Sequence, residues 1–149
     1  MDIEFSLKLA PFDAEFVDAL TQLSRSAFGQ TEREYVEWRL THMPVVTAFV
    51  ALSGDRIVAF KVGYATSRTK YYSWLGGVHP DFRDKGLASE LMRRQHAWLT
   101  ERGFSSIETA ANQENHAMAR LNLAHGFSVS GVRSTPGKTQ VLFSKQLDS

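Results

Sequence analysis

The chain has 149 residues, of which 43% are apolar, and its 17 basic and 16 acidic side chains leave a formal net charge of +1. This length fits one hydrophobic core and therefore a single domain over residues 1–149, and the near-neutral charge gives no reason to expect a nucleic-acid partner. The absence of cysteine excludes disulfides, cysteine nucleophiles and thiolate metal sites.

The apolar pattern predicts a series of strands and helices along the chain. Apolar residues recur at helical spacing from Phe16 onward, after an N-cap at Asp13, and Gly29 ends this helix. Thr31 begins a second helix, with Glu34 three positions later as in a capping box. In chain order we expect a strand at 3–9, helices at 16–27 and 31–39, strands at 45–52, 57–64 and 71–78, a helix at 86–102, a strand at 106–110, a helix at 115–125, and strands at 128–132 and 140–147.

This order predicts one α/β domain with a mixed, mostly antiparallel central sheet of about seven strands and helices on both faces. The helix at 86–102 joins the strands at 71–78 and 106–110 by a right-handed crossover, so these strands form the one parallel pair. We also expect a cytoplasmic protein. No apolar run approaches the roughly 20 residues of a membrane span, and the first four residues do not resemble a signal peptide.

The segment from Gly77 to Ala88 carries the clearest chemical signal. A strand ends at Val78, a tight turn follows, and a helix opens at Gly86. The first amides of a helix have no partner within it, and the helix dipole adds positive potential, so such a start binds phosphate groups. Gly86 lets a phosphate approach the backbone closely, and Arg83 and Lys85 add positive charge. The alternative interpretation is a basic surface turn that caps an ordinary crossover helix.

With these residues the sequence resembles the GNAT superfamily of acyl-CoA-dependent N-acetyltransferases. The family signature is Arg/Gln-x-x-Gly-x-Gly/Ala after a strand that ends in Val, and it is matched by Val78, Arg83, Gly86 and Ala88. A second signature is an Asn that opens a helix ending in Gly-Phe, and it is matched by Asn115 and Gly126-Phe127. The predicted elements also follow the order of the family, so the resemblance spans the chain.

The resemblance implies that the chain binds acetyl-CoA as a co-substrate and transfers its acetyl group to a primary amine by direct attack. The amides of residues 83–89 would hold the CoA pyrophosphate, and the two parallel strands would splay apart to admit the pantetheine arm. Gly76-Gly77 would supply the bulge that opens this gap, and an N–H near Gly77-Val78 would stabilise the oxyanion. The residues expected to bind the co-substrate are Gly77, Val78, Arg83, Asp84, Lys85, Gly86, Leu87, Ala88, Ser89, Asn115 and Asn122.

Two catalytic roles depart from the family pattern. Family members often use a Glu on the strand that ends at Val78 as the base, but residues 71–77 contain no acid, so the candidate is Glu108 on the neighbouring strand. The alternative is a solvent-facing Glu108 with a water relay as the base. In many members a Tyr protonates the departing thiolate. Here Asn122 takes its position, and it can donate a hydrogen bond but cannot deliver a proton. We expect Asn122 to contact CoA, and the alternative is a purely structural role.

The acceptor is expected to be a small-molecule or peptide amine, with contacts from variable segments. Four aromatic residues lie in segments that border the acceptor in this family, namely Phe28, Tyr35, Trp38 and Tyr72. The alternative interpretation is that they are core residues. Three acidic residues lie close together at Glu32, Glu34 and Glu37. They either attract a cationic acceptor or form a solvated helix face.

The remaining expectations concern partners and an alternative function. No histidine spacing builds a metal site, so we expect no metal, and we expect neither nucleic acid nor a membrane as a partner. The resemblance allows a homodimer, which is common in the family. The alternative function is an acyl-CoA-binding module with little or no transferase activity, which the two departures at the catalytic positions favour.

Overall fold

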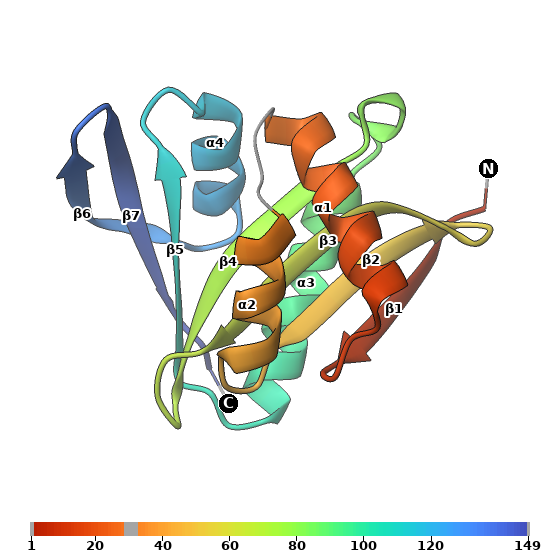
Figure 1. The fold of residues 1–149 in the computed structure, drawn as a ribbon. Helices are drawn as coiled ribbons and strands as arrows, with labels where there is room; N and C mark the ends of the chain where they lie inside the picture. Colours follow the sequence, from red (N-terminus) through yellow and green to blue (C-terminus); the bar gives the residue numbers. More distant parts are fainter. Residues whose placement is uncertain (1, 29–32, 149) are drawn as a thin grey trace.

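The computed structural model describes residues 2–28 and 33–148, which form one sheet with helices on both faces (Figure 1). The expected helix end at Gly29 and helix start at Thr31, and the side chain of Glu32, lie outside the described residues. The elements are β1 (Glu4–Leu9), α1 (Ala14–Phe28), α2 (Arg33–His42), β2 (Thr47–Ser53), β3 (Arg56–Ala65), β4 (Lys70–Val78), a 3-10 turn (Pro80–Phe82), α3 (Leu87–Glu101), β5 (Ser106–Asn112), α4 (His116–Ala124), β6 (Ser128–Thr135) and β7 (Lys138–Gln146).

The seven strands follow the order β1-β2-β3-β4-β5-β7-β6. Every neighbouring pair is antiparallel except β4 and β5, which α3 connects. The predicted fold class is therefore confirmed, including the single parallel pair. The element bounds differ from the predicted ones by three residues or fewer.

The helices cover the sheet in two layers, with α1 and α2 on one face and α3 and α4 on the other (Figure 1). The predicted N-cap of α1 is confirmed, because the Asp13 carboxylate accepts a hydrogen bond from the amide of Phe16 at 2.8 Å. On the first face the apolar stripe of α1 and Val36 and Leu40 of α2 are buried against β2 and β3. On the second face α3 buries Leu87, Leu91, Met92 and Leu99.

The bulge in β4 lies elsewhere than the sequence predicts. The expectation that Gly76-Gly77 form the bulge is wrong, because both residues pair regularly with β3. The register shifts between Val62 and Gly63 instead, which leaves Trp74 as the extra residue of β4. The physical reason is a close approach at Gly63, where a Cβ atom would lie 2.3 Å from Cε2 of Tyr71. The strands therefore become irregular where the Tyr71 ring crosses the backbone.

Candidate active site

A gap opens between β4 and β5 in the middle of the sheet. The two strands pair from Lys70 and Ser106 to Ser73 and Thr109. Residues 74–78 of β4 have no partner on β5, although residues 75–78 remain paired with β3. The predicted splay of the parallel strands is therefore present, and one edge of β4 is left with unpaired backbone groups.

The backbone of β4 directs specific amides into this gap. The amide of His79 donates to the carbonyl of Val58 on β3 at 2.8 Å. Successive residues of a strand direct their backbone groups to opposite edges, so the N–H groups of Gly76 and Val78 face the gap. These two amides are available to a ligand that runs along β4.

The loop after β4 holds its amides open in the way the sequence predicts. Asp84 and Gly86 have left-handed φ values of 61° and 76°, and Gly86 is the N-cap of α3. The first intrahelical bond runs from the Glu90 amide to the Gly86 carbonyl at 3.0 Å, so the amides of residues 87–89 have no partner within the helix. Residues 83–86 are exposed, and neither Arg83 nor Lys85 makes an ion pair with any residue that the structure describes. The loop therefore presents free amides and free positive charge.

Helix α4 closes the far side of the gap. The Asn115 side chain caps it, with Oδ1 accepting from the Met118 amide at 3.1 Å, and Asn115 also lines the cavity described below. At the other end of α4, Nε2 of His125 lies 2.6 Å from the Ser89 hydroxyl in the first turn of α3. This contact connects the end of α4 to the start of α3, next to the loop that presents the free amides.

A cavity of about 710 Å³ occupies the gap. Its walls come from β4 and β5, from α2 on one face of the sheet, from α4 on the other, and from the β6–β7 turn. The charged residues that line it are four cations and one carboxylate, namely Arg39, Lys61, Arg133, Lys138 and Glu114. Neutral hydrogen-bonding groups are supplied by Ser73, Thr109, Asn112 and Asn115. The cavity is therefore lined by residues from both faces of the sheet and carries an excess of positive charge.

An aromatic cage holds Arg39 in the wall of this cavity. Its guanidinium lies 5.2 Å from the Tyr35 ring, 5.5 Å from the Tyr64 ring and 5.4 Å from the Trp74 ring, and it donates to the Tyr64 hydroxyl. Of the aromatic residues predicted to border an acceptor, Tyr35 and Tyr72 line the cavity. Trp38 does not, and stacks on His42 instead, while the Phe28 side chain lies outside the described part of the structure.

The acidic run on α2 does not contribute to the cavity. Glu34 and Glu37 are exposed and do not line it, and Glu37 forms an ion pair with Arg33 at 2.8 Å. Of the two interpretations of this run, the structure supports the solvated helix face for the residues that it describes.

The two proposed catalytic residues lie outside the lining of the cavity. Glu108 is exposed on β5, in register with Tyr72 of β4, and the structure does not bring it into the gap. Asn122 is only 1% exposed, and neither its Oδ1 nor its Nδ2 has a hydrogen-bond partner among the described residues. Buried amides are normally paired, so this side chain has the capacity to bind a group that the protein itself does not supply.

Lys61 lines the cavity, although no motif in the sequence points to it. It lies on β3, exposes 9% of its surface, and its pKa is lowered to about 8 by burial. The available signal was a lone cation within the apolar run 57–64, which becomes a central strand of the sheet. A central strand with both faces covered leaves such a side chain little route to solvent.

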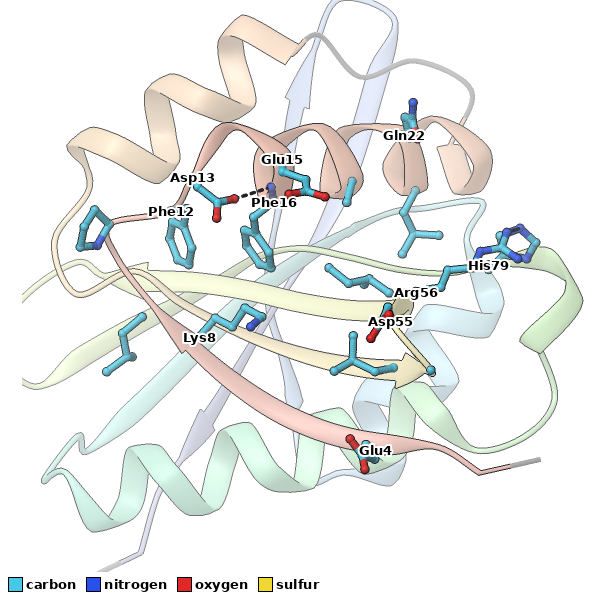
Figure 2. A pocket seen from close by; sticks show the side chains of 17 residues that line it. Glu4, Lys8, Phe12, Asp13, Glu15, Phe16, Gln22, Asp55, Arg56 and His79 are labelled. Carbon is cyan, nitrogen blue, oxygen red and sulfur yellow. Dashed lines mark hydrogen bonds between the residues drawn. The ribbon is translucent and has the colours of Figure 1, made fainter.

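A second cavity, of about 860 Å³, lies between β1, α1 and the β2–β3 turn, and Figure 2 shows it from close by. Phe12 and Phe16 lie on the α1 side, and Glu4, Lys8 and Asp55 lie toward the strands. Charges of both signs line this cavity, and it lies on the β1 side of the sheet, apart from the gap between β4 and β5. Its larger volume therefore does not make it the better candidate for the site of chemistry.

No helix in the described ranges is both long and apolar enough to cross a membrane. Within the same ranges, no three metal-ligating side chains gather into a site that would hold a metal ion.

The comparisons with known proteins agree on one family. The model of the Acetyltransferase (GNAT) family matches residues 15–127. An acetyltransferase from Pectobacterium atrosepticum is 31% identical over 83 residues, which are 56% of this chain and 57% of the relative. One from Sodalis glossinidius is 30% identical over 86 residues, or 58% and 59% of the two chains. The chain therefore spans somewhat more than half the length of the curated relatives that it matches.

The fold is also that of solved acetyltransferase structures. The ribosomal-protein-S18-alanine N-acetyltransferase from Escherichia coli superposes with a TM-score of 0.81 at 14% identity, over 97% of this chain and 96% of that one. A GNAT family acetyltransferase from Elizabethkingia anophelis with acetyl-CoA bound superposes with a TM-score of 0.77 at 14% identity, over 97% of this chain and 98% of that one. At this identity the superpositions show the fold alone, while the family model covers most of the sequence. The chain therefore belongs to the GNAT family of acetyltransferases.

Proposed function

We propose that this protein transfers the acetyl group of acetyl-CoA to a primary amine. The observation that carries the proposal is the end of strand pairing at Ser73 and Thr109, on the same strand that leads into the open amides of residues 83–89. One ligand with a phosphate group at one end and a chain of amides behind it fits both features. Acetyl-CoA is such a ligand.

The binding proposal assigns each part of the ligand to residues of the chain. The amides of residues 83–89, with Arg83 and Lys85, would bind the pyrophosphate. The amides of Gly76 and Val78 would pair with the pantetheine arm, as a strand pairs at an open sheet edge. Asn115 lines the cavity beside this path, and Asn122 would donate to the arm or to the sulfur.

The chemistry follows from holding two reactants in one cavity. The amine attacks the thioester carbonyl directly, so no covalent intermediate with the enzyme forms. A backbone N–H of β4 that faces the gap would stabilise the oxyanion, and the positioning of the two reactants would supply much of the acceleration. The acceptor would enter from the α2 side, where Tyr35 and Tyr72 line the cavity.

The base that removes the proton of the acceptor amine is either Glu108 or a water molecule. Glu108 is the candidate from the sequence, but its exposed position outside the cavity favours a water relay. Glu108→Gln separates the two possibilities. A hundredfold loss of kcat with unchanged acetyl-CoA affinity would establish Glu108 as the base, and full activity would leave the relay.

The alternative function is an acyl-CoA-binding module with little transferase activity. The positions of Glu108 and Asn122 outside the cavity lining favour it. The test is incubation of the full chain with acetyl-CoA and a panel that contains an alkylamine, an amino acid, an aminoglycoside and a peptide with a free N-terminus. The proposal expects free CoA and an N-acetylated product in equal amounts, detected by thiol titration and mass spectrometry. Acetyl-CoA binding by calorimetry without product from any amine would favour the module.

A further inference from the structure

Lys61 reaches the gap because of a glycine on the neighbouring strand. Lys61 of β3 and Gly76 of β4 are directly paired, and paired residues on antiparallel strands point to the same face of the sheet. A Cβ atom on Gly76 would lie 3.8 Å from Cγ of Lys61. Because Gly76 has no side chain, the stem of Lys61 can extend sideways over β4. Lys61 thus lines the cavity between β4 and β5 although it belongs to the strand behind.

The amine of Lys61 has no anionic partner. It makes no hydrogen bond or ion pair with any residue in the described ranges, and burial alone lowers its pKa to about 8. On the α3 and α4 side, the pKa values of His96 and His125 are lowered by burial and in part by the charge of Lys61, and the amine of Lys145 lies 2.9 Å from Nδ1 of His96. Across the cavity lie three cations and the single carboxylate of Glu114. At neutral pH Lys61 is therefore mostly a cation, buried without a counter-ion.

A buried cation of this kind is costly unless something compensates for it. An unpaired charge away from water destabilises the folded protein, and perturbed lysines of this type are typical of functional sites. An anion that forms in the cavity would compensate for this charge. If the proposed function holds, one such anion is generated there in each reaction cycle, namely the thiolate of the departing CoA.

We propose that Lys61 is the general acid that protonates the CoA thiolate as it leaves, and this assignment rests on the proposed function. The nitrogen of the acceptor forms a bond to the carbonyl carbon, the carbon–sulfur bond breaks, and its electron pair goes to sulfur. The ammonium of Lys61 gives a proton to that sulfur and becomes a neutral amine. After the attack, the acceptor nitrogen carries one proton more than the amide product. It loses this proton, which restores the ammonium of Lys61.

The environment of Lys61 suits this role. Its ammonium meets a negative charge only when the carbon–sulfur bond breaks, so the attraction is stronger in the transition state than before it. A thiol has a pKa near 8.5, close to that of Lys61, so the proton passes between groups of similar basicity. Asn122 cannot deliver a proton. Among the β3 residues that pair with residues 75–78 of β4, Lys61 is the one cation.

The first test needs no acceptor, because it uses CoA itself. The thiol of CoA bound to the full chain is titrated by the ultraviolet absorbance of its thiolate, in the wild type and in Lys61→Met. A nearby ammonium favours the thiolate, so we expect the bound thiol to ionise at least one pH unit lower in the wild type. Lys145→Met removes a cation on the same side of the sheet that does not line the cavity, and it should leave the wild-type value unchanged.

The outcomes of this titration separate the inference from the proposed function. Equal thiol pKa values in the wild type and in Lys61→Met would overturn the role of Lys61 and leave acetyl transfer intact. Failure of the wild type to bind CoA would overturn both. Methionine keeps the unbranched stem of the side chain, one atom shorter, and removes a buried charge, so Lys61→Met should unfold at the same temperature as the wild type or higher.

A kinetic measurement distinguishes catalysis from binding. With an acceptor from the amine panel, Lys61→Met should lower kcat about a hundredfold and change the KM for acetyl-CoA less than threefold. The wild-type rate should fall as the pH rises above about 8, where Lys61 loses its proton, and this decline should be absent in the variant. A raised KM with unchanged kcat would show that Lys61 only holds the pantetheine arm, and would contradict the proposal.

Discussion

The hydroxyl of Thr109 on β5 donates a hydrogen bond of 2.9 Å to the carbonyl of Ser73 on β4, at the last residue pair that joins the two strands. This bond lies at the point at which the sheet divides. On one side of it the strands pair normally, and on the other side β4 carries backbone groups that face a cavity. The start of the gap therefore coincides with a side-chain to main-chain hydrogen bond between the two strands.

Gly86→Val should weaken CoA binding at least tenfold, or by about 1.4 kcal/mol, measured by calorimetry. A branched side chain would occupy the space beside the amides of residues 87–89, and no other atom lies within 4 Å of its Cβ position. The substitution also strains the backbone, because Gly86 has a φ of 76°. Gly103→Val is the matched control, since Gly103 has a φ of 86° and equally open surroundings at the other end of α3. Equal CoA affinity in all three proteins would place the pyrophosphate elsewhere.

Asn122→Leu should stabilise the ligand-free protein and impair its activity. The two unpaired polar atoms of Asn122 cost about 1–3 kcal/mol, so chemical denaturation should show a higher free energy of unfolding. Loss of the hydrogen bond to CoA should lower turnover about tenfold or more. Asn115→Ala on the same helix should have the opposite effect on stability, a loss of about 1 kcal/mol, because it removes the cap of α4. Wild-type turnover in Asn122→Leu would make Asn122 purely structural.

The charge of the cavity predicts the charge of the preferred acceptor. Four cations and one carboxylate line it, so an amine that carries a carboxylate should react faster than a diamine of the same length. Competition between the two amines should give a ratio of kcat/KM values of at least about ten. Arg39→Gln should reduce this ratio, while Arg33→Gln, on the same helix but outside the cavity lining, should not. A preference for the diamine would contradict the electrostatic argument.

Acid should destabilise the protein through His96. The pKa of this histidine is lowered to about 3 by burial, and further by Lys145, Lys61 and His125. As the pH falls below 6.5, the unfolded chain takes up a proton that the folded protein cannot bind, so stability decreases. Between pH 6.5 and 5, the protonation of this one histidine in the unfolded chain lowers the free energy of unfolding by about 2 kcal/mol. Denaturation curves of His96→Gln should lack this part of the pH dependence, and those of His42→Gln, an exposed histidine, should keep it.

The local features of the fold could be predicted from the sequence, because they depend on short-range rules. The cap at Asp13, the helix opening at Gly86 and the cap at Asn115 each follow from a residue type at a fixed position. The single parallel pair follows from one crossover helix between two strands. The open loop follows from the helix start at Gly86, whereas the splay of β4 and β5 is what the resemblance to the GNAT superfamily implies.

Contacts between distant residues could not be predicted in the same way. A pair of glycines permits a bulge but does not require one, and the bulge lies at Trp74 because Tyr71 crosses Gly63 on the next strand. In the sequence, Lys61 is a solitary cation in an apolar strand. Its access to the gap depends on its pairing with Gly76. Neither relationship is visible before the register of β3 and β4 is known.

A crystal structure of the full chain with CoA tests the central claim most directly. The account predicts phosphate oxygens within hydrogen-bond distance of the amides of residues 83–89. It also predicts the pantetheine arm along the edge of β4 that faces β5, beyond Ser73 and Thr109. Ordered CoA in the cavity between β1 and α1, with the gap between β4 and β5 empty, would contradict it.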